Sequence, residues 1–411
     1  AFFHALKSQP NDLARSIYIS KHASQLSVPD QYIAMQLLAG AENELGLYNE
    51  ALRDFPLAPH VSENAVLPLG TEWHTADAVD VITRLAAKHR IVLINEAHHD
   101  AHTRLLTLAL LPRLRALGFT HFAAEALSEG DPGLMQRGYP IANSGTEYLH
   151  EPLYGEIIRT AIRLGFVIVP YDSNADSVPE REAEQADHLY QKIFAKDPNA
   201  RVFVHTGYAH VDKAKGRLGD AMPMAMHLQQ ASGFEPLSID QTNFRDVDSE
   251  NEADAYHRLI AAFHPQLPSV LLNNGDQHAW SIDPDRFDVS VILPLEVNRA
   301  DSSDIYKAPW MSFGLEGIAV KQVPHAEPRP HWLSLNGQRH PLPIDTALCA
   351  KTTPCVIEAH YAAEPDEATA ADRYLFVQGG ARNTLYLFPG QYRLRAWGVN
   401  GQTLGEKSVE L

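Results

Sequence analysis

The chain has 411 residues, of which 45% are hydrophobic and 21% charged, a composition that favours two or three folded domains and excludes extensive disorder. Its formal net charge is −17, and lysine and arginine do not cluster in any segment, which argues against nucleic acid and anionic membrane surfaces as partners. No window approaches eighteen uninterrupted apolar residues, so no membrane span is expected.

Residues 1–75 are predicted to form a helical cap, because the first sixty residues show no strand-like alternation of apolar and polar positions. The segment "ELGLYNEALRDFPLA" has the small and aromatic spacing of one tetratricopeptide-like helix pair. No second copy of this pattern is visible, so a cap packed on the next domain is favoured over a repeat array. The residues that carry the pattern are Gly46, Tyr48, Ala51, Phe55 and Ala58.

Residues 76–300 alternate short apolar runs with amphipathic helices, which is typical of successive strand–helix–strand units. Continuous apolar runs indicate strands buried on both faces, so the predicted fold class is α/β, with a mostly parallel sheet flanked by helices. Two of the helices are expected to end at Gly118 and Gly165, because glycine is favoured just beyond a helix C-terminus. The predicted strands are 90–95, 119–126, 166–172, 201–207, 236–240, 269–274 and 288–294.

Residues 330–411 instead alternate apolar and polar positions between "PG" and "NG" turns, the pattern of antiparallel hairpins. We therefore predict a small C-terminal antiparallel β-sandwich domain, with the stretch near 300–330 as its connection to the α/β core. If the chain has a protein partner, the N-terminal helices and this sandwich are the surfaces expected to bind it.

The two cysteines, Cys349 and Cys355, lie close together in "LCAKTTPCV". Their number and spacing do not fit a zinc or redox CxxC motif, so a local disulfide is favoured over two unrelated thiols. A disulfide predicts a periplasmic or secreted location, whereas free thiols predict a cytoplasmic one. The start "AFFHALKSQPNDLARS" lacks the basic residues and long apolar core of an intact signal peptide, so we expect such a peptide to have been removed.

Titratable side chains follow five of the predicted strands, at the point where each strand ends. Because ligands bind beyond the carboxyl ends of parallel strands, where loops converge, these groups are expected to line one crevice. They are Glu96, His98 and His99 after the first strand, Glu125 after the second, Asp172 after the third, His205 and His210 after the fourth, and Asp276 and His278 after a later one.

Glu96 directly follows a buried strand, where loss of solvation can raise the pKa of a carboxyl group into the range of acid–base catalysis. Its alternative role is an N-cap for the helix that begins near His102. His98 and His99 point in opposite directions if the chain is extended, so at most one of them is expected to face the crevice while the other packs below it. His102 itself is expected on a solvated first helical turn.

Glu125 ends an otherwise apolar run, and a buried carboxylate needs a partner such as a histidine, an arginine or a metal ion. Arg181 is the candidate for that ion pair, with a surface position as its alternative. Gly207 allows the backbone to approach a ligand closely, and His210 after it is the favoured functional histidine. His205 ranks second because a satisfied core histidine is common at such a position. The candidate substrate-binding residues are Arg181, Asp172, His205 and His278.

The motifs "IVLINEAHHD", "FTHFAAEAL", "EREAEQADHLYQKI" and "RVFVHTGYAHV" resemble the superfamily that includes erythromycin esterase-like enzymes, haem-binding ChaN-like proteins and Tiki proteases. The resemblance covers about residues 85–295. Its members have a strand ending in G-E-x-H or G-E-x-x-H, a second strand ending in glutamate, a helix with an arginine, and a late histidine. Asn95 stands where the family has its leading glycine. The matching residues are Glu96, His98 for the shorter spacing and His99 for the longer, Glu125, Arg181 and His210.

The esterase-like branch implies a Glu/His site that activates water against an ester or lactone carbonyl, and the sequence contains no G-x-S-x-G, H-E-x-x-H, P-loop or G-x-G-x-x-G motif. The Tiki-like branch implies a divalent metal held by the same glutamates and histidines, and the ChaN-like branch implies haem without turnover. We predict a hydrolase of carboxylic ester or amide bonds in small-molecule or peptide substrates. The alternatives are a haem- or metal-binding protein without turnover and a catalytically inactive binding protein.

Overall fold

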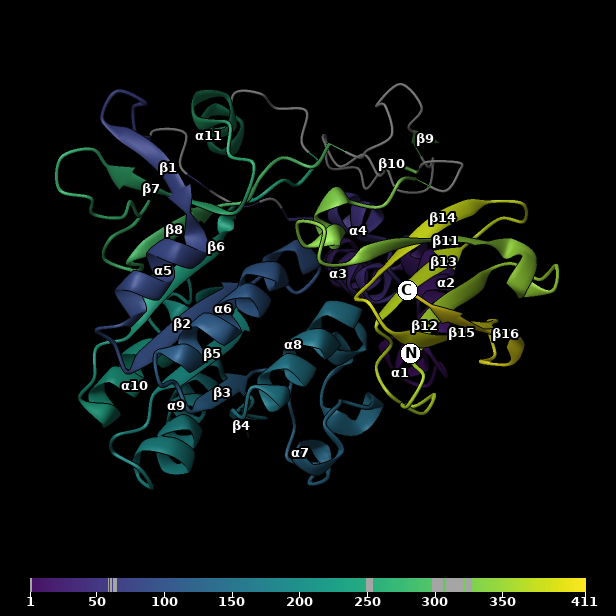
Figure 1. Ribbon diagram of the computed structural model, residues 1–411, viewed down its shortest axis with the longest axis horizontal. Helices are drawn as coiled ribbons and strands as arrows, with labels where there is room; N and C mark the ends of the chain where they lie inside the picture. The colour runs from purple at the N-terminus through teal and green to yellow at the C-terminus, as the bar shows by residue number, and fades with distance from the viewer. Residues whose placement is uncertain are drawn as a thin grey trace.

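The computed structural model describes residues 2–57, 59, 61, 65–248, 254–297, 306–307, 321–322 and 327–411. N-terminal helices come first along the chain, an α/β region built on one large sheet follows, and antiparallel strands end it (Figure 1). The predicted fold class is therefore confirmed: a large, mostly parallel sheet flanked by helices, with separate antiparallel sheets at the C-terminal end.

The N-terminal helices pack against the C-terminal strands as well as the α/β region. Gly46, just after the third helix, has a φ of +78°, and a Cβ there would lie 2.1 Å from the carbonyl oxygen of Arg373. Leu13 and Leu45 join the apolar core of the C-terminal strands. The helices are α1 (Phe2–Lys7), α2 (Asp12–His22), α3 (Val28–Glu44) and α4 (Tyr48–Asp54).

The large sheet has eight strands in the order β1-β7-β8-β6-β2-β5-β3-β4. All seven predicted strands are present, and an additional edge strand, β1, pairs with β7 in antiparallel fashion. Strand β7 also runs antiparallel to β8, so only the part from β8 to β4 is parallel. The strands are β1 (Trp73–Asp77), β2 (Ile91–Glu96), β3 (His121–Ala124), β4 (Val167–Pro170), β5 (Val202–Gly207), β6 (Leu237–Phe244), β7 (Ser269–Asn273) and β8 (Val289–Ile292).

Helices cover both faces of this sheet because alternate residues of each strand point to opposite sides. Val92 and Ile94 pack in the cluster that contains the apolar residues of α5, α6 and α8, whereas Ile91 and Leu93 pack with α9 and α10. As expected, Gly118 and Gly165 follow the ends of α6 and α8 in the left-handed conformation. The helices are α5 (Ala78–Ala86), α6 (Leu105–Ala116), α7 (Leu134–Arg137), α8 (Pro152–Arg163), α9 (Val178–Leu189), α10 (Met224–Ser232) and α11 (Ala255–Phe263).

The C-terminal strands form a four-stranded antiparallel sheet, β13-β12-β15-β16, and a two-stranded one, β11-β14, around a common apolar core. Most of the predicted connection at 300–330 lies outside the described residues, although the short strands β9 (Tyr306–Lys307) and β10 (Lys321–Gln322) pair within it. The remaining strands are β11 (His340–Asp345), β12 (Cys355–Tyr361), β13 (Asp372–Phe376), β14 (Arg382–Leu387), β15 (Gln391–Trp397) and β16 (Thr403–Glu410).

Cys349 and Cys355 form the expected disulfide, just before and at the start of β12. The bond fits an oxidising compartment, because reducing compartments keep such thiols free. Within the described part of the chain, no helix has the length and apolar character needed to cross a membrane.

Candidate active site

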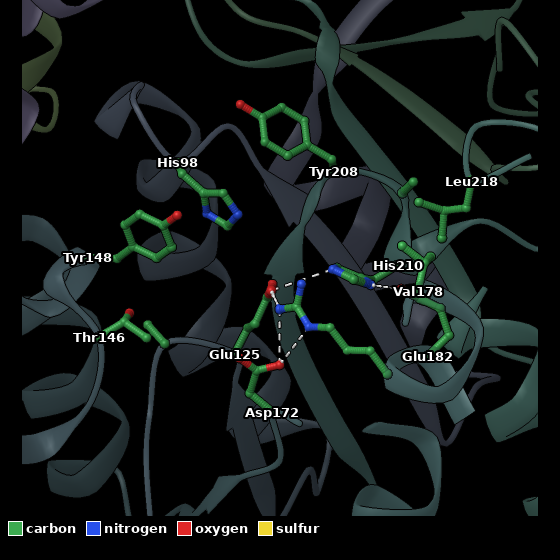
Figure 2. A pocket seen from close by; sticks show the side chains of 13 residues that line it. His98, Glu125, Thr146, Tyr148, Asp172, Val178, Glu182, Tyr208, His210 and Leu218 are labelled. Atoms are coloured by element: carbon green, nitrogen blue, oxygen red, sulfur yellow. Dashed lines mark hydrogen bonds and ion pairs between the residues drawn. The ribbon is translucent and has the colours of Figure 1, made fainter. Parts of the chain in front are cut away.

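A pocket of about 390 Å³ opens at the carboxyl ends of the parallel strands β2, β3, β4 and β5 (Figure 2). Parallel pairing sets Glu96 at the end of β2 beside Gly207 at the end of β5, which brings the loops that follow these strands together. Polar and aromatic groups make most of the pocket wall, with His98, Glu125, Thr146, Tyr148, Asp172, Arg181, Glu182, Tyr208 and His210, and the apolar remainder is Ala126, Val178, Ala209 and Leu218.

Glu96 lies beneath the pocket and is 1% exposed. Its Oε1 accepts a hydrogen bond from His98 Nδ1 at 2.8 Å, and its Oε2 accepts one from Arg104 Nε at 2.7 Å. Burial alone would raise the pKa of Glu96, but Arg104 and His205 outweigh it and hold that pKa well below its usual range. The prediction of a raised pKa for Glu96 is therefore wrong: the carboxyl group is an ionised acceptor.

His98 is the histidine of the first loop that faces the pocket. Because ionised Glu96 can only accept, the proton of the neutral His98 ring belongs on Nδ1, which leaves the Nε2 lone pair free. Tyr148 stacks on the ring with 4.3 Å between centroids, and Tyr208 meets it edge-on at 5.3 Å. The His98 ring is thus fixed in both tautomer and orientation.

Gly207 leaves room for two functional groups to reach the same space. A Cβ on Gly207 would lie 2.5 Å from His98 Nε2 and 3.2 Å from Glu125 Oε2. The backbone amide of Gly207 donates to Glu125 Oε2 at 2.5 Å, and the Thr206 hydroxyl donates to the same oxygen at 3.0 Å. The Nε2 atom of His98 and the Glu125 carboxylate therefore face one point in the pocket.

Arg181 of α9 pairs with Glu125, as the sequence indicated, with 2.7 Å between Nη2 and Oε1. The same guanidinium donates to Asp172 Oδ1 from Nε at 3.2 Å and from Nη2 at 3.0 Å. Burial would raise the pKa of Glu125, but His210, His98 and Arg181 together hold it well below its usual range. The carboxylates of Glu125 and Asp172 thus both bind Arg181, whose side chain remains 35% exposed on the pocket wall.

His210 is a second cation in the pocket. Its Nδ1 lies 2.7 Å from Glu182 Oε1, and its Nε2 lies 3.4 Å from Glu125 Oε1 (Figure 2). Burial lowers the pKa of His210, yet the carboxylates of Glu125 and Glu182 outweigh it and raise the pKa to about 10. At neutral pH His210 is therefore protonated and cannot serve as the base that accepts a proton from water.

Two of the predicted histidines lie next to the pocket without lining it. His99 is 2% exposed, stacks on Phe55 with 3.4 Å between centroids and is not among the residues of the pocket wall. His205 is fully buried, and its Nε2 lies 3.0 Å from Glu96 Oε2 while its Nδ1 contacts the Thr107 hydroxyl at 2.9 Å. His205 therefore supports Glu96 from below and does not reach a substrate in the pocket.

Two other expectations are wrong for identifiable reasons. His278 and Asp276 follow β7, and because β7 runs antiparallel to β8, its carboxyl end lies at the opposite edge of the sheet. The two side chains form an exposed pair there. His102 is 5% exposed instead of solvated, because its ring stacks on Trp332. The N-cap of that helical turn is Asp100, which excludes this alternative role for Glu96.

Four residues of the site were not singled out from the sequence: Arg104, Tyr148, Glu182 and Tyr208. Arg104 is fully buried and joins Glu96 to Glu151, with 2.9 Å between its Nη1 and Glu151 Oε2. The sequence could have indicated Arg104 through its position in "HHDAHTR", close to the predicted site residues, and Glu182 through its position next to Arg181. Tyr148 lies in η4 (Glu147–His150), a single 3-10 turn between α7 and α8 that is too short for periodicity to indicate which side chain turns inward.

The donor set does not fit a divalent metal in this pocket. Both oxygens of Glu125 already accept hydrogen bonds from protein donors, and Arg181 and protonated His210 hold the positions that a cation would need. Among the described residues, the five proposed ligands do not form a group of three whose donor atoms lie within 4.8 Å of one another.

No protein-family model matches the chain, and no curated protein matches it. Among solved structures, the chain is similar to haem-bound ChaN of Campylobacter jejuni at 12% identity, covering 51% of this chain and 100% of that one, with a TM-score of 0.29. It is also similar to the type III effector HopBA1, at 14% identity, 43% and 87% coverage and a TM-score of 0.30.

A third similarity is to RRSP, a MARTX toxin effector domain from Vibrio vulnificus, at 15% identity, 47% coverage of this chain and a TM-score of 0.30. The chain spans 42% of that structure, and 39% of another described as bacterial protein toxins. At such TM-scores the similarities say nothing about the activity of this chain.

Proposed function

We propose that the chain is a hydrolase of carboxylic ester or amide bonds that uses His98 as the general base for an attacking water. The observation that supports this is the hydrogen bond from partly exposed His98 to buried Glu96, which leaves Nε2 of His98 facing the pocket as a free acceptor. In this proposal the substrate is a small molecule or a peptide, and the oxidising compartment is the periplasm or the exterior.

The first step is proton transfer from water to His98 Nε2 while the water oxygen attacks the carbonyl carbon. Glu96 stabilises the imidazolium that forms, because its carboxylate is ionised and already hydrogen-bonded to Nδ1. A positioned base of this kind contributes ~10²–10⁴ to the rate. Glu96 acts through His98 and is a positioning residue.

Charge on the opposite wall supports the tetrahedral intermediate, which breaks down when the His98 imidazolium gives its proton to the leaving alcohol or amine and the carboxylic acid product is released. Attack converts the carbonyl oxygen into an oxyanion, which cationic groups stabilise strongly where water is excluded. Arg181 is partly exposed in the pocket, and His210 is protonated at neutral pH. Arg181 and His210 would therefore bind the oxyanion or a carboxylate of the substrate, while Glu125 and Asp172 hold Arg181 in place.

The test is hydrolysis of panels of esters, lactones and peptides by the wild-type chain and by His98→Gln. We expect His98→Gln to lose ~10²-fold or more in kcat/KM, whereas His278→Gln, an exposed histidine on the far edge of the sheet, should match the wild type. Equal activity of the two variants would refute the role of His98. An absence of hydrolysis, together with a Soret band after haem addition, would favour a binding protein without turnover.

A further inference from the structure

A second cluster of metal-ligand side chains lies where the N-terminal helices meet the α/β region. Asp12 begins α2, Glu44 ends α3, and His150 ends the 3-10 turn η4 (Glu147–His150). One donor atom from each of the three residues lies within 4.8 Å of the others. Only the tertiary fold brings these side chains together, and none of them lines the pocket.

Glu44 has a buried carboxylate oxygen that the protein leaves unsatisfied. The residue is 3% exposed, and its Oε2 has no hydrogen-bond partner. A buried acceptor without a donor is costly, and a second carboxylate, Asp12, lies beside it. A cation held between the two carboxylates would give the unpaired oxygen of Glu44 a partner and offset the repulsion between Glu44 and Asp12.

The separation of Asp12 and His150 agrees with a coordination shell, and a donor atom of Glu44 lies within 4.8 Å of both. His150 Nδ1 lies 3.0 and 3.1 Å from the two oxygens of Asp12. Two ligands at tetrahedral positions, each with a bond of 2.0–2.2 Å to zinc, are separated by ~3.3 Å. An imidazole with two carboxylates suits zinc and similar first-row ions, whereas magnesium and calcium favour oxygen ligands alone.

We infer that Asp12, Glu44 and His150 bind one divalent transition-metal ion of the zinc class. Two arginines limit the affinity of the site without filling it: Arg15 Nη1 lies 3.7 Å from Asp12 Oδ1, and Arg373 Nη1 lies 3.6 Å from Asp12 Oδ2. Neither forms an ion pair with Glu44 in the described part of the chain. His150 is partly exposed, at 24% of its side chain, and offers an entry path.

The bound ion would join the N-terminal helices to the wall of the pocket. Tyr148, two residues before His150 in η4, stacks on the ring of His98. Asn43, the neighbour of Glu44, donates from Nδ2 to the carbonyl oxygen of His98 at 3.3 Å. The site is argued from its own donors and does not depend on hydrolysis in the pocket.

The test is zinc binding by the full chain, first stripped with a chelator and then titrated with zinc chloride, with bound metal measured by elemental analysis after dialysis. We expect one zinc ion per chain that magnesium chloride does not displace. In Glu44→Gln the affinity for zinc should fall by more than the ~10–100-fold that is typical when a residue supporting a metal ligand is replaced. His278→Gln, which removes an exposed histidine beside Asp276, is the matched control and should keep the full affinity.

Circular dichroism checks that each variant is folded, and His150→Gln, at a partly exposed position, repeats the test if Glu44→Gln does not fold. His98→Gln should retain zinc, and loss of zinc in that variant would assign the ion to the pocket instead. A wild-type chain that binds no zinc, or a Glu44→Gln chain that binds it as tightly as the wild type, would overturn the inference. Asp12 and Glu44 would then share a proton and no metal.

Discussion

Replacing Gly207 with alanine places one methyl group between the two functional groups of the pocket. The backbone of Gly207 has φ −83° and ψ 147°, which alanine adopts freely, so the effect comes from the side chain alone. The new Cβ would lie 2.5 Å from His98 Nε2, whereas an ordinary contact is ~3.5 Å, so the ring has to retreat by about 1 Å.

His98 cannot retreat without loss, because Glu96 holds its Nδ1 at 2.8 Å and Tyr148 covers its face. A displacement of about 1 Å from the productive geometry can cost ~10² in rate, so we expect kcat/KM to fall by about that factor. Overpacking costs typically ~1–3 kcal/mol, so the free energy of unfolding should fall by no more than that and the variant should remain folded.

The assay compares ester hydrolysis and thermal unfolding of Gly207→Ala with those of Gly40→Ala. Gly40 lies in α3, and a Cβ there meets nothing within 4 Å, so alanine should leave activity unchanged and stabilise the helix by ~0.5–1 kcal/mol. Wild-type activity in a folded Gly207→Ala variant would refute the placement of the reaction at His98 Nε2. A crystal structure of that variant with His98 and Glu125 unmoved would refute the geometry itself.

The pKa of His210 is raised to about 10, so the stability that protonated His210 contributes is complete below its ordinary pKa of ~6.5 and is lost as the pH rises toward 10. Between these pH values the denaturant midpoint should therefore fall by less in His210→Gln than in His278→Gln. Equal falls of the midpoint with pH in the two variants would contradict the ion pairs of His210. Cys349→Ser/Cys355→Ser should lower the free energy of unfolding by about 2 kcal/mol for a bridge spanning six positions, and two alkylatable thiols in the native wild type would remove the case for an oxidising compartment. Limited proteolysis is expected to cut the chain between about residues 296 and 330. The two fragments should still co-elute in gel filtration, because Arg159 of α8 forms an ion pair with Glu364 at 2.6 Å. Elution as two separate folded fragments would show that the C-terminal sandwich is an independent domain.

The parallel strands could be predicted because continuous apolar runs indicate burial on both faces of a sheet. The direction of a strand could not be predicted, because it does not change the pattern of apolar residues. "SVLLNN" has the same pattern whichever way β7 runs, so the sequence indicated His278 as part of a site from which it is remote. β1, "WHTAD", escaped prediction because none of its residues is fully buried and its pattern is weak.

The candidate site could be predicted as a set of residues but not as a set of charges. The pKa of Glu96 is lowered where a raised one was predicted, because Arg104 and His205 outweigh burial, and His210 is a cation because of Glu125 and Glu182; His205 and Glu125 are far from these residues in the sequence. Arg104, nearer to Glu96 along the chain, is fully buried, although the sequence predicted a solvated helical turn at His102, two residues before it.

Asn43 of α3 bonds to the loop after β2, so changes in the N-terminal helices and in this loop are expected to be coupled during evolution. Its side chain donates to the carbonyl oxygen of His98 and accepts from the backbone amide of Ala101, so one amide group spans the loop that carries His98. A substitution that tilts α3 would therefore shift that loop, and one that reshapes the loop would strain α3. Exchange of the α/β region alone between relatives should succeed only when the N-terminal helices are exchanged with it.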